Sequence, residues 1–139
     1  MSENDSDELR LERARKAFAL VPYAKFLGLE LGSISRGEAS LHLEVRDNLK
    51  QNQGLVHGGA VASLIDTAAA FAVVTQLEPD ERVTTTDLTI HYLRPITAGR
   101  LTARARIIRS GRRLFVLSVD VANGDRLSAT AVTTYIKLR

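Results

Sequence analysis

The chain has 139 residues, of which 45% are hydrophobic and 25% charged, a composition typical of one globular domain with its own core. It has no cysteine, which excludes disulfides, thiolate metal sites and a cysteine nucleophile and agrees with the cytoplasmic location that we expect. Aromatic residues make up only 5% and tryptophan is absent, so the chain is poorly supplied for stacking on nucleic-acid bases.

The formal net charge of +3 hides an uneven distribution along the chain. Residues 1–93 carry 9 Lys/Arg and 14 Asp/Glu, a net charge of −5, whereas residues 94–139 carry 10 Lys/Arg and 2 Asp/Glu, a net charge of +8. So basic a segment favours an anionic partner, which could be nucleic acid, a membrane surface or a phosphorylated ligand. The alternative is that the arginines only keep exposed strands in solution.

Neither a secretory signal nor a membrane span is expected. The N-terminus begins with acidic residues and has no apolar stretch behind a basic one. The one long apolar segment, residues 58–77, is mostly alanine and carries Asp66 near its middle, which a membrane-spanning helix would avoid.

The first half of the chain predicts a helix followed by two strands. A helix is expected over residues 5–20, where Asp5 or Ser6 can cap it and Pro22 ends it, with a short helical turn at 23–27. Apolar residues alternate from Leu27 to Leu31 and again over 39–46, around a tight turn at 36–38, and this pattern predicts a hairpin. Residues 47–53 are polar and form a loop.

The middle of the chain predicts a buried helix. From residue 60 to 77, apolar side chains cover nearly every side, which is typical of a helix inside a core. Its one polar stripe consists of Ser63, Asp66 and Thr67, which share a face at i, i+3 and i+4.

Four further strands are predicted, over residues 83–93, 101–108, 115–121 and 127–138. The element order is a hairpin, a buried helix and an antiparallel meander. It predicts an α+β fold in which an antiparallel sheet wraps around one long buried helix. Because one sheet layer covers only part of such a helix, we expect a homo-oligomer.

Two features of the buried helix are candidates for chemistry. A carboxylate such as that of Asp66 is costly on a buried helix unless it is paired or used by a site, so function is favoured over a structural ion pair. The tripeptide His57-Gly58-Gly59 stands where the helix begins, and free backbone N–H groups there could stabilise developing negative charge as an oxyanion hole. The alternative is a glycine-rich turn with a hydrogen-bonded histidine.

The spacing of these features predicts a shared site. Gly58 and Asp66 are eight residues apart, about 12 Å along a helix at 1.5 Å per residue. One small reacting group cannot touch both in one chain, so a site that uses both must combine Gly58 of one chain with Asp66 of another. The three histidines lack metal-ligand spacing, and no P-loop or dinucleotide motif is present.

The stretch from Gln51 through His57-Gly58-Gly59 to Asp66, and the strand that ends in Arg94-Pro95, resemble the hotdog-fold acyl-CoA thioesterases. The branch they resemble contains the phenylacetate-pathway and 4-hydroxybenzoyl-CoA (Arthrobacter-type) enzymes. The resemblance covers about residues 20–139. It divides the chain into an N-terminal helical extension, 1–20, and a hotdog thioesterase domain, 21–139.

The resemblance implies a role for each matching residue. Asp66 would be the nucleophile or a general base on water, and the Gly58 N–H would polarise the thioester carbonyl. His57 would support this region, Gln51 falls where the family carries Asn or Gln, and Thr85 falls where some members orient water with Ser or Thr. The resemblance also suggests contacts to the coenzyme A phosphates from a group of arginines, Arg94, Arg112 and Arg113.

The implied activity is hydrolysis of a small or medium acyl-CoA, aromatic ones included, to the free acid and coenzyme A. No cofactor is implied beyond the coenzyme A of the substrate, and neither nucleic acid nor membrane is an expected partner. The family's sites form across a dimer interface, and its members are usually tetramers built from two dimers. Two alternatives stay open, a non-catalytic acyl-CoA-binding sensor and an acyl-thioester hydratase on the same fold.

Overall fold

The computed structural model describes residues 3–139, and the side chains from residue 6 onward. Two helices come first, followed by a hairpin, a short 3-10 turn, the long helix and four strands. In order they are α1 (Glu3–Phe18), α2 (Pro22–Leu27), β1 (Glu30–Ser35), β2 (Glu38–Glu44), η1 (Asp47–Leu49), α3 (Gly58–Val74), β3 (Val83–Tyr92), β4 (Arg100–Ser110), β5 (Leu114–Asn123) and β6 (Arg126–Lys137).

Most predicted element boundaries shift by only a few residues. Helix α1 begins at Glu3, so Asp5 and Ser6 lie in its first turn instead of capping it. The first strand begins at Glu30 because Leu27 still belongs to α2, which ends where Gly28 takes a left-handed conformation with φ of 79°.

All six strands form one antiparallel sheet in the order β1-β2-β4-β5-β6-β3. The predicted meander is therefore correct for β4, β5 and β6 and wrong for β3, which pairs with β6 at the far edge. The connection from β3 to β4, residues 93–99, contains Pro95 and is too long for a tight hairpin turn. Strand β2 pairs with β4 instead, and this joins the first hairpin and the meander into a single sheet.

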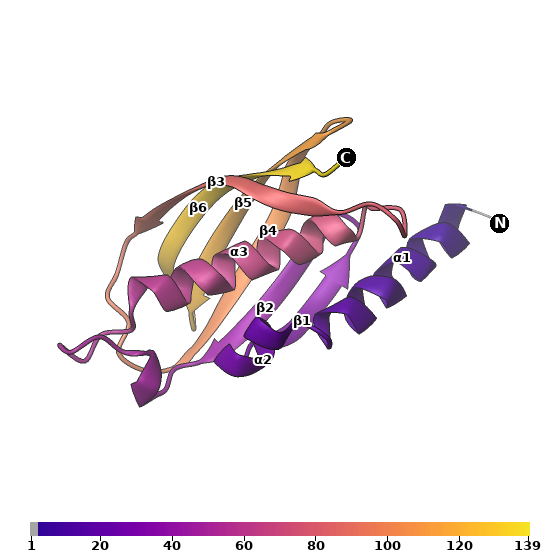
Figure 1. Cartoon of the computed structure of the whole chain (residues 1–139). Helices are drawn as coiled ribbons and strands as arrows, with labels where there is room; N and C mark the ends of the chain where they lie inside the picture. The colour runs from indigo at the N-terminus through magenta and orange to yellow at the C-terminus, as the bar shows by residue number, and fades with distance from the viewer. Residues whose placement is uncertain (1–2) are drawn as a thin grey trace.

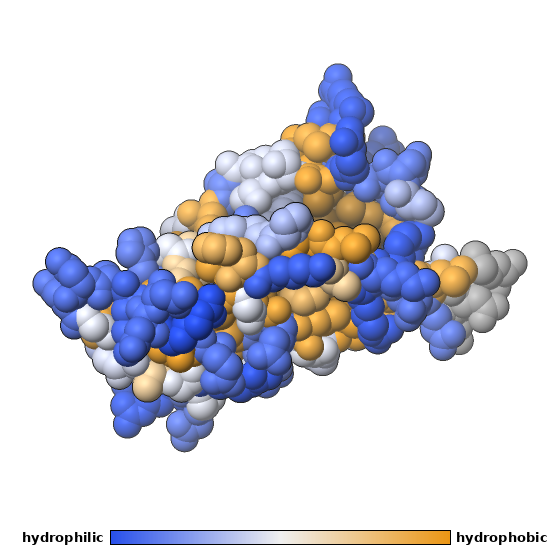
Figure 2. All heavy atoms as spheres, turned by 60° about the horizontal axis from the view of Figure 1, so that its bottom comes forward, coloured by the Kyte–Doolittle hydropathy of each residue, from blue (hydrophilic) through white to orange (hydrophobic). Residues whose placement is uncertain are grey.

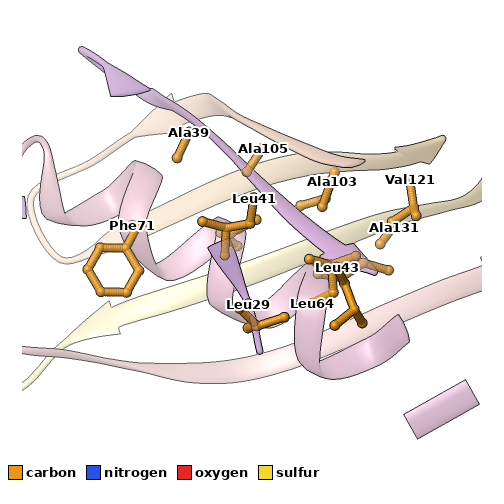
Figure 3. Close-up of a cluster of buried hydrophobic side chains, with 14 of the residues drawn as sticks. Leu29, Ala39, Leu41, Leu43, Leu64, Phe71, Ala103, Ala105, Val121 and Ala131 are labelled. Carbon is orange, nitrogen blue, oxygen red and sulfur yellow. The ribbon is translucent and has the colours of Figure 1, made fainter. Parts of the chain in front are cut away.

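The sheet curves around α3, which lies along its concave face (Figure 1). Leu64, Ile65 and Ala68 of α3 are fully buried. Figure 3 shows Leu64 beside Leu43 of β2 and among inward side chains of the other strands. Burial of a large aliphatic side chain stabilises the fold by about 1.5–3 kcal/mol, so the predicted α+β hotdog arrangement rests on this helix–sheet contact.

One stripe of α3 is left partly uncovered by the sheet. Gly59 is exposed, and Ser63, Asp66, Ala70 and Val74 are half-buried at helical spacing. Figure 2 shows hydrophobic atoms reaching the surface, between hydrophilic ones, on the side that comes forward from the bottom of Figure 1. The large exposed apolar residues of the chain's N-terminal part are Leu9, Leu20, Tyr23 and Phe26.

The N-terminal helix packs beside the C-terminal half of α3. Phe18 meets Phe71 edge to face, with ring centroids 5.3 Å apart, and Ala14 is fully buried. Arg10 forms an ion pair with Glu78, just beyond the end of α3. The division of the chain at residue 20 stays a prediction, since α1 packs directly against the helix of the following segment.

Candidate active site

The carboxylate of Asp66 lies between α3 and the β3–β6 edge of the sheet. Its Oδ1 accepts a hydrogen bond of 2.9 Å from the Thr85 hydroxyl and another of 2.7 Å from the Tyr135 hydroxyl. The Tyr135 hydroxyl also lies 2.7 Å from the backbone carbonyl oxygen of Asp66. Asp66 is half-buried, so a carboxylate is held here within reach of the surface.

Tyr135 is a permanent hydrogen-bond donor in this cluster. Its side chain is only 3% exposed, and burial raises the pKa of its phenol above the usual value. The neighbouring Asp66 carboxylate raises that pKa further, and the Thr85 hydroxyl partly opposes the shift. The phenol therefore keeps its proton at neutral pH.

A bulge in β3 brings Thr85 into the site. Thr85 pairs with Tyr135 of β6, and the next pair is Asp87 with Thr134, so Thr86 is an extra residue. Without the bulge, Thr85 and Leu88 would point to opposite faces of the sheet. With it, Thr85, Leu88 and Ile90 are all half-buried, and Thr85 reaches Asp66.

The N-terminus of α3 forms the second part of the site. His57 caps the helix, and its Nδ1 accepts a hydrogen bond of 2.8 Å from the Gly59 N–H. The Ala60 N–H bonds to the His57 carbonyl. Among the described residues, none accepts a hydrogen bond from the Gly58 N–H, so this group is available to a ligand.

A surface hollow of about 300 Å³ opens beside Gly58. It is lined by the beginning of α3, the end of β3 and the loops that precede α3 and follow β3, and its residues include Gln51, Leu55, Gly58, Tyr92, Arg94 and Ile96. The Gln51 side chain oxygen accepts a hydrogen bond from the Gln53 N–H, so that oxygen bonds within its own loop. The hollow thus brings three of the predicted site residues, Gln51, Gly58 and Arg94, together at the end of α3 that His57 caps.

The predicted site residues fall into separate groups within one chain. Gln51, His57, Gly58 and Arg94 lie at the beginning of α3, and Asp66 and Thr85 lie two helical turns further along. Another group lies at the opposite end of the sheet, where the turn from β4 to β5 carries Arg112 and Arg113. The structure does not bring the three arginines together in one chain.

Two tyrosines of this region were not predicted as site residues. Tyr135 contacts Asp66, and the Tyr92 hydroxyl donates a hydrogen bond of 2.8 Å to the Gly58 carbonyl oxygen. Tyr92 follows Leu88 and Ile90 at every second residue of β3, so alternation places the three on one face of the strand. Tyr92 is 53% exposed, whereas Tyr135 is buried, and a tyrosine on the buried face of a strand is a usable signal because its hydroxyl needs a polar partner.

Two further observations concern the described residues as a group. No three histidine, aspartate or glutamate side chains among residues 6–139, whose side chains are described, are placed to hold a metal ion together. None of the helices described is long and apolar enough to cross a membrane.

Comparison with known proteins gives consistent matches. The family profile of the thioesterase superfamily matches residues 53–130. The medium/long-chain acyl-CoA thioesterase YigI of Salmonella typhimurium is 33% identical, over 84% of this chain and 85% of that protein. The 1,4-dihydroxy-2-naphthoyl-CoA hydrolase of Listeria monocytogenes is 31% identical, over 70% of this chain and 79% of that protein.

The fold also matches solved structures. The E. coli PaaI protein, from the phenylacetic acid degradation operon, superposes with a TM-score of 0.86 and 25% identity over 94% of each chain. The residues matched by the family profile include His57, Gly58, Asp66, Thr85 and Arg94.

Proposed function

The chain belongs to the thioesterase superfamily, and from this premise we propose that it hydrolyses the thioester of an acyl-CoA to a free acid and coenzyme A. The observation that carries the proposal is the pairing of two groups on α3. A half-buried carboxylate is held by two hydroxyl donors, and an unpartnered N–H stands at the beginning of the same helix. Thioester hydrolysis needs both an attacking oxygen and a donor for the carbonyl oxygen.

The chemistry follows from these two groups. The Gly58 N–H donates a hydrogen bond to the thioester carbonyl oxygen in the hollow, and stabilises the oxyanion that forms when an oxygen attacks. Asp66 either attacks the carbonyl carbon itself or removes a proton from the water that does. In the direct route, the Asp66 oxygen displaces the thiolate and forms an acyl anhydride, the thiolate takes a proton from solvent, and water then hydrolyses the anhydride to the free acid and the Asp66 carboxylate. In the other route, water adds to the carbonyl carbon, the carbon–sulfur bond breaks, and Asp66 passes the proton it took from water to the thiolate.

The proposed site is shared between two chains. Gly58 and Asp66 belong to one straight helix and are separated by about 12 Å along its axis. A carbonyl carbon and its oxygen are far closer than that, so Asp66 must come from a partner chain. A homodimer, or a tetramer built from two such dimers, supplies this partner and covers the half-buried stripe of α3.

The arginines are proposed contacts for the coenzyme A phosphates. Arg94 lies in the hollow beside Gly58, whereas Arg112 and Arg113 lie at the far end of the sheet. They could reach one coenzyme A molecule only across a chain boundary. All three are exposed, and an arginine forms strong charge-assisted hydrogen bonds to phosphate.

The test is release of free thiol from a panel of acyl-CoAs with aliphatic and aromatic acyl groups. We expect turnover of small or medium acyl groups without an added cofactor, with free acid formed in equal amount to coenzyme A. Tight binding without thiol release would instead favour a sensor, and a change in the acyl chain that leaves the thioester intact would favour a hydratase. The proposed cytoplasmic location is tested by cell fractionation.

A further inference from the structure

The two hydroxyl donors at Asp66 act on the same carboxylate oxygen. Thr85 and Tyr135 both donate to Oδ1, at 2.9 and 2.7 Å. They reach it from neighbouring strands, where Thr85 of β3 is the register partner of Tyr135 of β6. The orientation of the carboxylate is therefore set by two strands that are paired directly beside it.

The other oxygen, Oδ2, is left free. Within the described part of the chain, nothing donates a hydrogen bond to Oδ2. No buried side-chain nitrogen or oxygen of these residues lacks a partner, so the unpartnered Oδ2 is in contact with the surface. One oxygen of Asp66 is thus anchored, and the other is presented outward.

Tyr135 is more deeply buried than either of its partners, Asp66 and Thr85. Its ring is 3% exposed, and β6 places it between Phe115 of β5 and Thr85 of β3. Its hydroxyl proton is shared between Oδ1 and the backbone carbonyl oxygen of Asp66, so the phenol is fixed against the helix backbone as well as against the side chain.

We propose that Tyr135 is a positioning residue for the hydrolysis, which anchors Oδ1 of Asp66 so that Oδ2 is the oxygen that attacks the thioester or activates water. This inference rests on the proposed role of Asp66. The competing explanation is that Tyr135 only fills the core, in which case its hydroxyl is dispensable. The two explanations differ in what loss of one oxygen atom does to catalysis.

The first test is Tyr135→Phe, which keeps the ring and removes the hydroxyl. We expect kcat to fall by about 10- to 100-fold, the range for loss of one hydrogen bond to a charged group, with KM changed less than about twofold. A fall in kcat without a matching change in KM separates the positioning of Asp66 from a general loss of structure. Unchanged kcat overturns the inference.

A matched control is Tyr23→Phe. It removes a hydroxyl that forms a hydrogen bond of 2.9 Å with Ser63, which lies on α3 as Asp66 does, and it leaves the contacts of Asp66 intact. This variant keeps the wild-type kcat and KM. In an Asp66→Asn background, Tyr135→Phe causes no further loss, since Tyr135 acts through Asp66. A further loss in that background also contradicts the inference.

A second substitution covers the outcome that Tyr135→Phe fails to fold. Replacing Tyr135 with a ring-fluorinated tyrosine keeps the shape and the hydroxyl but makes the hydroxyl a stronger donor. The kcat then changes while KM stays the same, and an unchanged kcat overturns the positioning role. Asp66→Asn in the wild-type chain separates the two proposals, because full activity in that variant contradicts the proposed function itself.

Discussion

The Tyr92 hydroxyl donates a hydrogen bond of 2.8 Å to the carbonyl oxygen of Gly58, which joins the end of β3 to the first residue of α3. A Cβ atom on residue 58 would lie 3.3 Å from both the ring carbon Cζ and the hydroxyl oxygen of Tyr92. Tyr92 therefore forms a wall of the hollow beside the free Gly58 N–H, and a larger residue at position 58 would fill the space proposed for the thioester.

Asp66→Asn is expected to lower thiol release from acyl-CoA by at least about a thousandfold, because the amide can neither attack nor take a proton. The amide oxygen still accepts from Thr85 and Tyr135, so the melting temperature stays close to that of the wild type. Initial rates and thermal unfolding measure the two effects. Asp87→Asn, which neutralises an exposed acid of β3, is the control and keeps full activity.

A mixture of two inactive variants is expected to regain activity. Chains with Asp66→Asn supply an intact Gly58, and chains with Gly58→Leu supply an intact Asp66, so a mixed dimer contains one complete site. Random pairing of equal amounts gives about one quarter of the wild-type activity per site. The measurement is thiol release after the two chains are co-expressed or refolded together.

The complementation has a direct control. Mixing either variant with a chain that carries both substitutions restores nothing, since no dimer then contains an intact Gly58 opposite an intact Asp66. A mixture of the single variants that stays inactive, with mixed oligomers shown to form, contradicts a site shared between chains.

Arg94→Gln and the pair Arg112→Gln and Arg113→Gln are expected to raise KM for acyl-CoA by about 5- to 30-fold, because each removes a charge-assisted contact to phosphate. KM for the matching acyl-pantetheine, which lacks the nucleotide phosphates, stays unchanged. Steady-state kinetics with both substrates measure the difference. Arg106→Gln, on an exposed position of β4, serves as the control. An equal rise for both substrates would mean that these arginines act elsewhere.

Phe18→Ala is expected to lower the free energy of unfolding by about 2–4 kcal/mol, since it removes the ring that packs edge to face on Phe71. Phe26→Ala removes the same ring from a side chain that is 78% exposed, and changes stability by less than about 0.5 kcal/mol. Urea denaturation of both variants measures the difference. Equal stabilities would show that α1 contributes nothing by this contact.

The raised pKa of Tyr135 predicts a loss of stability in alkali. The folded chain holds the phenol proton more tightly than the unfolded chain, whose tyrosine ionises near pH 10. The contribution of the Tyr135 phenol to stability is fully present below that pH. As the pH rises further, the free energy of unfolding falls by up to about 1.4 kcal/mol per pH unit for this one group. Urea denaturation from pH 8 to 11 measures the slope. The Tyr135→Phe variant has no phenol at this position, so its free energy of unfolding falls less steeply with pH. Equal slopes in both proteins would contradict the prediction.

The sequence alone determined the elements and the two ends of the proposed site. Apolar spacing identifies a buried helix from residue 60 onward, because a helix that is apolar on nearly every side has no stable place in water. Alternation identifies each strand and its inward residues, and Asp66 is conspicuous because a carboxylate on such a helix is costly. The distance from Gly58 to Asp66 follows from the rise of a helix and the number of residues between them.

Only the tertiary structure decided how these elements meet. The period of a strand gives the face of each residue but not the neighbour of the strand, so the sequence favoured a meander, whereas β3 pairs with β6 at the edge. A bulge at Thr86 adds one residue to β3 and so shifts the alternation of its side chains between the two faces of the sheet. This shift brings Thr85 to Asp66. Tyr135 stands 69 residues from Asp66, and a contact over that separation is set by the folding of the whole sheet, which no local pattern encodes.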